Sequence, residues 1–478
     1  MTDRKELLER AQSIEESLHP YDLVVDGAPI WPVLRVTVCN RSLRGEMKPT
    51  GPPPRSGAGK NLRTLGHGAL QWRRSRLSAR PGGLLFLTER SYWTQSTQGT
   101  TDRFALPLMQ AASELGVPST LVVKDPVAKA LVDLPEGTTT IRLDEALRAR
   151  ALHHWRRPVE PLRHIPGSGP VIEALASSYA KEPVAFLAKA VHGFRMHLRT
   201  WRSALRAFRP DHVFVTCWYA VENMAIAQAA HELGIPCTDV QHGVQGPAHF
   251  AYGNWMAMPS TGCSTIPSHF WCWDAGSADN IRSWAPAGHH RAFVGGAPWI
   301  EEHGIAPGQR TSGALRVLVT LQPVARPIPA VLTEAIRQMG NGCHWTIRTH
   351  PRAAEQAEQA RQWAKEEGLL PWITVEGAEA EPIGSSLAGT DVHLTLYSSV
   401  ALEASLCGVP TIALDPLAGD LFPDLLGNGS LVIRTSSEAL VAELARTPAN
   451  GMHRTTLPPL RERVQGFLAR TSTTVNTR

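Results

Sequence analysis

Asp391-Val-His-Leu-Thr-Leu-Tyr-Ser-Ser-Val-Ala-Leu-Glu-Ala-Ser-Leu-Cys-Gly-Val-Pro-Thr-Ile-Ala-Leu414 is the stretch from which the fold can be predicted. It predicts a strand, a Ser-Ser turn, a helix, a Gly-x-Pro joint and a second strand. Because the turn lies where the carboxyl end of a strand meets the amino end of a helix, free N–H groups and the helix dipole favour a phosphate there. Glu403 follows Ser399 by four residues, so we expect its carboxylate to reach a ribose.

The Gly-x-Pro joint occurs three times, at Leu115-Gly-Val-Pro118, Leu233-Gly-Ile-Pro236 and Cys407-Gly-Val-Pro410. In each, a glycine that can take the left-handed conformation ends a helix, and the proline prevents the helix from continuing. A buried strand is expected to follow. Parallel strands need crossover helices between them, so these joints predict a doubly wound α/β architecture.

Twelve short, largely apolar segments are expected to be strands, at 83–88, 119–124, 211–216, 236–241, 270–273, 291–295, 315–321, 344–349, 372–376, 391–396, 410–414 and 430–434. Residues 294–309 resemble a linker, and residues 184–208 form one long amphipathic helix by their spacing of apolar side chains. We expect two Rossmann-like, doubly wound parallel-sheet domains facing each other across a cleft. The expected divisions are an N-terminal segment (1–80), an acceptor domain (81–300), a nucleotide-donor domain (301–445) and a C-terminal tail (446–478).

Composition is that of an ordinary globular protein, with 478 residues, 43% hydrophobic and 19% charged. The seven cysteines are scattered without a C-x-x-C pair, which indicates a reducing compartment and argues against a disulfide framework or a structural zinc site. No signal peptide and no apolar run long enough to span a bilayer is visible. We therefore expect a cytoplasmic protein, with peripheral attachment at the inner face of the membrane as an open alternative.

The basic charge is concentrated in residues 41–80, which hold ten arginines and lysines against Glu46 alone. This segment is rich in Gly and Pro around residues 50–59 and is expected to be a mobile loop. It could be a solvated linker or a contact for anionic lipid or a lipid-phosphate acceptor. Nucleic acid is not expected as a partner, because aromatic interleaving is limited to Trp72. The apolar segment Tyr21–Arg35, with a turn at Asp26-Gly27, could cap the first domain or dock on a membrane.

Ligands of open α/β sheets bind outside the carboxyl ends of the strands. In the second domain these ends carry hydroxyls, an imidazole, a helix amino end and guanidinium groups, a set that suits a phosphoester. The expected nucleotide- and phosphate-binding residues are Gln322, Arg348, His350, Arg352, Ser398, Ser399 and Glu403. A purely structural role for His350 or for the Ser-Ser pair is the alternative.

In the first domain, the strand 236–241 is followed by His242 and Gly243. An imidazole on a sharp turn, with a pKa near neutrality, could act as a general base on an acceptor hydroxyl. A histidine that only hydrogen-bonds the turn is the alternative. Glu89, at the end of the first strand, is a rival base.

Several common chemistries lack their motifs. The adjacent histidines 153–154 and 289–290 do not have metal-site spacing, and no Asp-x-Asp pair, Walker loop or G-x-G-x-x-G motif occurs at a strand end. These absences argue against a metal-dependent transferase, an NTPase and a dehydrogenase. No metal and no cofactor is expected.

The His350-Pro351 and Ser398-Ser399 pairs resemble the His-Pro and Ser-Ser motifs of bacterial sialyltransferases, polysialyltransferases and Kdo transferases, which have the GT-B fold. In those families the motifs hold the CMP phosphate. The chain is also similar to CDP-glycerol glycerophosphotransferases, which carry a His-Gly motif in the first domain and a His-Pro motif in the second. The resemblance covers roughly residues 210–435 and implies that His242 is the base, while His350, Ser398 and Ser399 contact the donor phosphate.

These observations predict a metal-independent glycosyltransferase of bacterial surface (capsular or lipo-) polysaccharide synthesis. Its donor would be nucleotide-activated, with a CMP or CDP link favoured over UDP, and its acceptor a glycan or lipid-linked hydroxyl. His242, or Glu89, would deprotonate the acceptor, and Arg348, His350 and the Ser-Ser turn would stabilise the departing phosphate. The alternatives are a CDP-alditol phosphotransferase, a nucleotide-sugar epimerase of the same fold and a non-catalytic partner in polysaccharide export.

Overall fold

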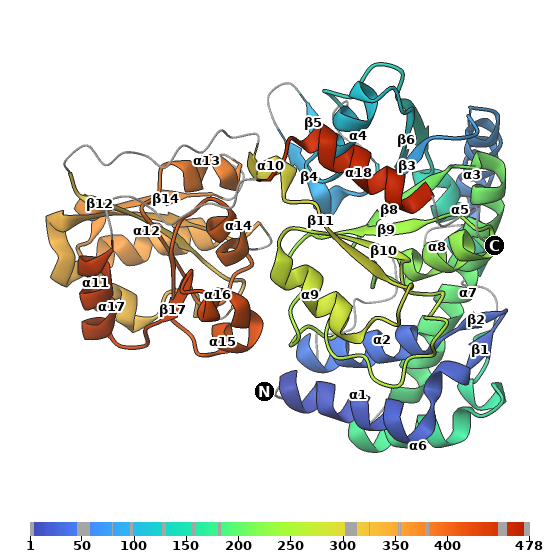
Figure 1. The fold of residues 1–478 in the computed structure, drawn as a ribbon, viewed down its shortest axis with the longest axis horizontal. Helices are drawn as coiled ribbons and strands as arrows, with labels where there is room; N and C mark the ends of the chain where they lie inside the picture. Colours follow the sequence, from blue (N-terminus) through green and yellow to red (C-terminus); the bar gives the residue numbers. More distant parts are fainter. Residues whose placement is uncertain are drawn as a thin grey trace. The chain divides into compact units, whose positions relative to one another are not determined.

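The computed structural model describes residues 4–44, 58–78, 80–95, 99–126, 131–154, 158–179, 183–301, 313–324, 326–351, 353, 355–377, 382–447 and 457–472. The chain forms two compact units, Met1–Gly296 with Pro458–Arg478, and Ala297–Leu457. Each unit contains one parallel sheet with helices packed on it (Figure 1).

The sheet of the first unit has seven strands in the order β11-β10-β9-β8-β3-β6-β7, all parallel to their neighbours. They are β3 (Leu84–Thr88), β6 (Ser119–Val123), β7 (Thr139–Arg142), β8 (His212–Thr216), β9 (Cys237–Val240), β10 (His269–Cys272) and β11 (Arg291–Val294). The order reverses between β3 and β8, which is the topological switch point of a doubly wound sheet. The six strands expected here are confirmed. The edge strand β7 was not predicted, because its polar sequence Thr-Thr-Ile-Arg has a single apolar residue.

The sheet of the second unit has the order β14-β13-β12-β15-β16-β17, again all parallel. Its strands are β12 (Leu315–Thr320), β13 (Cys343–Arg348), β14 (Ile373–Glu376), β15 (Val392–Thr395), β16 (Thr411–Ala413) and β17 (Leu431–Ile433). All six were expected, and the switch point lies between β12 and β15. Both units are therefore Rossmann-like, which confirms the predicted fold class.

The three Gly-x-Pro joints have the predicted geometry. They follow α4 (Ala105–Glu114), α8 (Val221–Glu232) and α14 (Val400–Leu406), and Gly116, Gly234 and Gly408 have φ values of 73°, 69° and 73°. At the third joint the Val409 N–H donates to Ala404 O at 2.9 Å, and Pro410 O accepts from His393 N–H at 2.9 Å. The other two joints have the same pair of bonds. Each joint thus ends a helix and hydrogen-bonds the neighbouring strand in one short segment.

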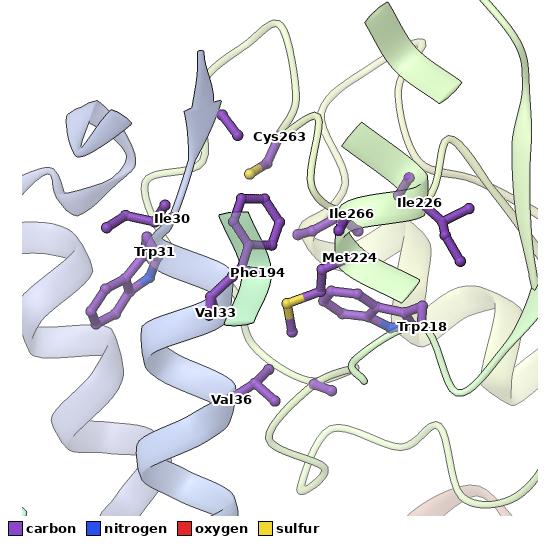
Figure 2. Close-up of a cluster of buried hydrophobic side chains, with 14 of the residues drawn as sticks. Ile30, Trp31, Val33, Val36, Phe194, Trp218, Met224, Ile226, Cys263 and Ile266 are labelled. Carbon is purple, nitrogen blue, oxygen red and sulfur yellow. The ribbon is translucent and has the colours of Figure 1, made fainter. Parts of the chain in front are cut away.

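The N-terminal segment is part of the core of the first unit. It comprises α1 (Arg4–Leu18), the short hairpin β1 (Val24–Val25) and β2 (Ala28–Pro29), and α2 (Trp31–Arg44). Asp26 and Gly27 form the hairpin turn with φ values of 51° and 82°, as a primed turn requires. The buried Ile30, Trp31 and Val33 belong to one cluster with Phe194 of α7 (Pro183–Phe208) (Figure 2). Of the two open readings of this segment, the structure supports the cap on the first domain.

The expectation of a loop through residues 41–80 is wrong over much of its length. The segment begins inside α2, and Ala58–Ser78 form the helix α3, which packs on α5 (Asp144–His154) (Figure 1). Residues 45–57, which carry the Gly/Pro cluster, lie outside the described residues. Within α3, Gly68 serves close packing between helices rather than a turn, because a Cβ atom there would lie 2.3 Å from Ala149 Cβ of α5. The long helix expected at 184–208 is confirmed as α7.

The remaining elements complete the two units. They are the hairpin β4 (Trp93–Gln95) and β5 (Thr100–Asp102), α6 (Ser168–Ser178), α9 (Ala275–Trp284), α10 (Pro298–Glu301), α11 (Ala330–Met339), α12 (Gln356–Glu366), α13 (Ile383–Ala388), α15 (Leu417–Leu421), α16 (Pro423–Gly427), α17 (Ser437–Arg446) and α18 (Leu460–Ser472). The expected linker, residues 294–309, contains the short helix α10, whose Trp299 is buried. Within the expected C-terminal tail, α18 buries Phe467 against Trp271 and Phe293 of the first unit. Among the described residues, no helix has both the length and the apolar character needed to cross a membrane.

Candidate functional site

Three strand ends come together at the switch point of the second sheet. Thr320 of β12 is in register with Arg348 of β13 and with Thr395 of β15. Gln322, His350 and Ser398 follow that common rung by two or three residues. The candidate phosphate-binding residues of three separate segments therefore leave the sheet at the same edge, where α/β folds bind their ligands.

Hydrogen bonds to the ends of β15 and β12 hold the Ser-Ser turn in place. The Ser398 N–H donates to Thr395 Oγ1 at 3.2 Å, and that hydroxyl donates to Thr320 O at 3.1 Å. Ser398 Oγ accepts from Val400 N–H at 3.3 Å. The helix that follows, α14, has only seven residues. The helix is short, and two of its first N–H groups, those of Ala401 and Leu402, already donate to Ser398 O and Ser399 O.

Arg348 is buried and faces the outer strand β14. Its Nη1 donates to Ser386 Oγ of α13 at 2.9 Å and lies 3.5 Å from Glu376 Oε2. The guanidinium charge is therefore partly compensated, and its clearest function is to join β13, β14 and α13. Arg352 lies outside the described residues.

Gln356 of α12 joins the first two strand ends. Its Nε2 donates to Gln322 O at 2.8 Å, its N–H donates to Ala353 O at 3.0 Å, and Ala353 N–H donates to His350 O at 2.9 Å. Gln356 Oε1 is buried without a hydrogen-bond partner in the described part of the chain. His350 is half-buried, while Glu403 is buried on α14. Gln356 was missed by sequence reasoning because it lies inside a helix, not at a strand end.

A half-buried ionic cluster occupies the switch point of the first sheet. Lys124, the first residue after β6, lies 3.0 Å from Glu89 Oε2, which follows β3, and 3.3 Å from Glu222 Oε2 at the start of α8. Burial alone would raise the pKa of Glu89, but Lys124 and a hydrogen bond from Ser91 hold it below its ordinary value. Burial likewise opposes ionisation of Glu222, and Lys124 overcomes it and lowers the pKa. At neutral pH both carboxylates are ionised and share one lysine.

His242 lies in the long loop between β9 and β10, residues 241–268. Its ring is half-buried, with Nε2 3.3 Å from the Tyr219 hydroxyl, and Nδ1 is buried with no hydrogen-bond partner among the described residues. Burial, reinforced by Arg103 and opposed by Glu89, lowers the pKa of His242 to about 4. The imidazole is therefore neutral at pH 7 and can accept a proton, although it is a weaker base than a free histidine.

Asp239 of β9 positions the two loops that carry Tyr219 and His242. It is fully buried, and its oxygens accept from Trp218 N–H at 2.9 Å and from the Tyr252 hydroxyl at 2.7 Å. The Tyr219 ring in turn lies 5.8 Å from the His242 ring and 5.7 Å from that of Tyr252. The loops after β8 and β9 are thus joined through one carboxyl group and an aromatic cluster.

The N-terminal helices hold the same loop from its other side. Glu15 of α1 and Arg35 of α2 form a 2.7 Å ion pair in which both side chains are 0% exposed. Arg35 Nη2 donates to Gly253 O at 2.7 Å, and Glu15 Oε2 accepts from Met256 N–H at 2.8 Å. An ordered loop of this length is uncommon unless it has a function, and here a buried ion pair from a distant part of the sequence fixes its shape.

The structure therefore brings Gln322, His350 and the Ser-Ser turn to one edge of the second sheet, and it places Glu89 and His242 in the first unit, within electrostatic reach of each other. Residues that sequence reasoning missed there are Lys124, Glu222, Tyr219 and Asp239. Lys124 could have been found by the strand-end rule, because it ends the predicted strand 119–124. Within the described residues, no group of three or more His, Cys, Asp or Glu side chains could hold a metal ion.

No family model and no curated protein matches the sequence. Among solved structures, the chain is similar to the UDP-GlcNAc 2-epimerase of Methanocaldococcus jannaschii, with a TM-score of 0.48, 13% identity, and 82% of this chain and 100% of that chain covered. It is also similar to a putative UDP-N-acetylglucosamine 2-epimerase of Listeria monocytogenes, with a TM-score of 0.48 and 13% identity; 84% of this chain and 98% of that chain are covered. For a glycotransferase of kitacinnamycin the TM-score is 0.44 and the identity 14%, and 83% of this chain and 96% of that chain are covered.

Proposed function

We propose that the chain is a glycosyltransferase of bacterial surface polysaccharide synthesis that takes a nucleotide-activated sugar as donor. The observation that carries this proposal is the common rung of Thr320, Arg348 and Thr395, beyond which an amide, an imidazole and two serine hydroxyls leave one sheet edge. These groups, placed at the switch point of a Rossmann-like sheet, suit a nucleoside phosphate.

In this proposal the second unit binds the donor. His350, Ser398 and Ser399 hydrogen-bond the phosphate next to the sugar and stabilise the charge that develops there when the bond to the anomeric carbon breaks. Gln322 contributes a further polar group, and Glu403 accepts hydrogen bonds from the ribose hydroxyls. Arg348 is a positioning residue, because Glu376 and Ser386 already hold its guanidinium.

The first unit binds the acceptor. The neutral His242 imidazole takes the proton of the acceptor hydroxyl as its oxygen attacks the anomeric carbon, and the nucleotide leaves with the electron pair of the broken bond. Tyr219 orients the ring through Nε2. Glu89 is the weaker base, because Lys124 lowers its pKa.

Nucleotide binding tests the donor site. We expect CMP or CDP, at about a hundred times the dissociation constant, to stabilise the protein by roughly 2.7 kcal/mol and to raise its melting temperature by several degrees. The His350→Ala variant should lose this shift. The matched control is His344→Ala, which changes an exposed histidine of β13, the strand that precedes His350; its Nε2 lies 3.1 Å from Thr374 Oγ1.

Each result has a clear meaning. A preference for UDP would favour an ordinary hexose donor, and a shift that survives His350→Ala would remove His350 from the site. If no nucleotide stabilises the protein, the non-catalytic export partner becomes the better reading. With a donor identified, His242→Ala should lower the transfer rate by about 10² to 10⁴ without changing the nucleotide shift; an unchanged rate would contradict its role as the base.

A nucleotide-sugar epimerase is the second candidate, and one observation favours it. Glu89 and Glu222 gather at the switch point of the first sheet around Lys124, and an epimerase needs ionisable groups around a single sugar to move a proton. Incubation of the activated sugar without acceptor distinguishes the two. A change in the configuration of the sugar would support the epimerase, whereas an unchanged sugar that is transferred only when acceptor is added supports the glycosyltransferase.

A further inference from the structure

Helix α3 is docked on the first unit by one of its faces. A Cβ atom at Gly68 would lie 2.3 Å from Ala149 Cβ, so the two helices touch backbone to backbone at this point. Gln71 caps α5, because its Oε1 accepts from Ala146 N–H at 2.8 Å and its Nε2 donates to Asp144 at 2.9 Å. The Ser75 hydroxyl donates to Arg142 O at 3.1 Å. These contacts fix the rotation of α3 about its own axis, and so determine which side chains face away from α5.

The opposite face of α3 combines exposed leucines with arginines. Leu70 is 47% exposed and Leu77 is 78% exposed, and the two lie seven residues apart, on the same side of the helix. Arg73 and Arg74 lie between them and are exposed, as is Arg76. No carboxylate of the described residues forms an ion pair with these three arginines. The face is thus both apolar at its centre and strongly basic.

We propose that the outer face of α3, formed by Leu70, Arg73, Arg74 and Leu77, docks on an anionic membrane surface. Phosphate groups of anionic lipids complement the arginines, whose long stems allow the charge to stay among headgroups while the leucines enter the acyl boundary. Leucines at the centre of the face have no role in binding a nucleic acid backbone. The one aromatic residue of the helix, Trp72, is covered by Arg150 at 4.0 Å, so it is not available to stack on bases.

A lipid-linked acceptor lies at the membrane surface, so an enzyme that uses one must approach that surface. Because Gly68, Gln71 and Ser75 hold α3 rigidly on α5, docking would bring the whole first unit to the membrane in one orientation. The surface does not depend on the proposed reaction, since none of its residues belongs to either candidate site.

Vesicle flotation of the full chain tests the proposal. We expect binding to phosphatidylcholine vesicles that contain about 30% phosphatidylglycerol, no binding to phosphatidylcholine alone, and weakening as salt rises from about 0.1 to 0.5 M. Arg73→Gln with Arg74→Gln should lower partitioning by about 30-fold. Leu70→Ser with Leu77→Ser should also lower it. The control, Arg361→Gln with Lys365→Gln, removes two charges from the exposed face of α12 and should leave binding unchanged.

Three results would overturn the proposal. They are equal binding to vesicles with and without phosphatidylglycerol, no binding at low salt, and equal losses in the α3 and α12 variants. Preferential binding of a DNA or RNA oligonucleotide by the same arginines would assign the surface to nucleic acid instead. Circular dichroism and melting temperatures of the variants show whether they fold, which is expected because every changed side chain is exposed.

Discussion

Gly253 closes the loop that carries His242. A Cβ atom at this position would lie 1.8 Å from Pro247 O, and the overlapping atom is backbone, which cannot rotate away. We therefore expect Gly253→Ala to open the loop and to lower the free energy of unfolding by about 1 to 3 kcal/mol. Because the same loop presents His242, transfer activity should fall as well. Urea denaturation measures the first effect.

The matched control is Gly193→Ala, in the middle of α7. A Cβ atom there meets nothing within 4 Å, so the alanine should stabilise the helix by about 0.5 to 1 kcal/mol. We therefore expect Gly253→Ala to lower the free energy of unfolding and Gly193→Ala to raise it. If Gly253→Ala were neutral, the close approach of Gly253 to Pro247 would not be essential for the loop.

At the scale of elements, α1 and α2 hold residues 253–256 in place through Glu15 and Arg35. Arg35→Met leaves Glu15 charged, buried and without its cation, and breaking a buried pair in this way costs about 3 to 5 kcal/mol. The variant also loses the contact of the guanidinium with the Trp255 ring at 3.9 Å. We expect a fall of that size in the free energy of unfolding, together with faster hydrogen exchange at the loop amides.

Two further variants locate the cause of this effect. Adding Glu15→Gln to Arg35→Met removes the unpaired charge and should restore part of the stability. Arg282→Met breaks an exposed pair with Asp279, 51% and 69% exposed, and should cost less than about 1 kcal/mol. A loop that exchanges normally in Arg35→Met would mean that α1 and α2 do not hold it.

At the scale of the whole molecule, buried neutral histidines couple stability to pH. His393, in the centre of the second sheet, lies between Thr320 Oγ1 at 2.8 Å and Thr411 Oγ1 at 3.1 Å, and burial lowers its pKa to about 3. Between that value and the unfolded pKa near 6.5, the unfolded chain binds a proton that the folded chain does not. Stability is therefore lost as the pH falls, by about 1 kcal/mol between roughly pH 7 and pH 5.5 from this residue alone.

Replacing His393 isolates this contribution from the other titrating groups. In His393→Gln the difference in unfolding free energy between the two pH values should shrink by about 1 kcal/mol relative to the unchanged protein. His344→Gln, which removes an exposed histidine of the same unit, should leave the difference as it is. An equal pH dependence in His393→Gln and in the unchanged protein would show that His393 becomes protonated without unfolding.

Local sequence predicted the strands of both sheets well, and it predicted the candidate residues that follow them. Strand ends such as those before Gln322 and Ser398 are visible because a buried parallel strand is a short apolar run, and the polar residue that ends it stands out. The helix α3 was missed because the Gly/Pro cluster at residues 50–59 led us to expect a loop through the whole basic segment. The contact of Gly68 with Ala149, which holds this helix, joins residues far apart in the sequence and is not visible in the local pattern.

The sequence by itself determined the class of fold, because the Gly-x-Pro joints at residues 116, 234 and 408 act within a few residues of the chain. Only the tertiary structure decided which strands are neighbours and therefore where the switch points lie. It also decided that Lys124 is shared by Glu89 and Glu222, and that Arg35 holds the loop at Gly253. Such pairings depend on which distant side chains are buried together, and this is set by the packing of the whole unit rather than by local pattern.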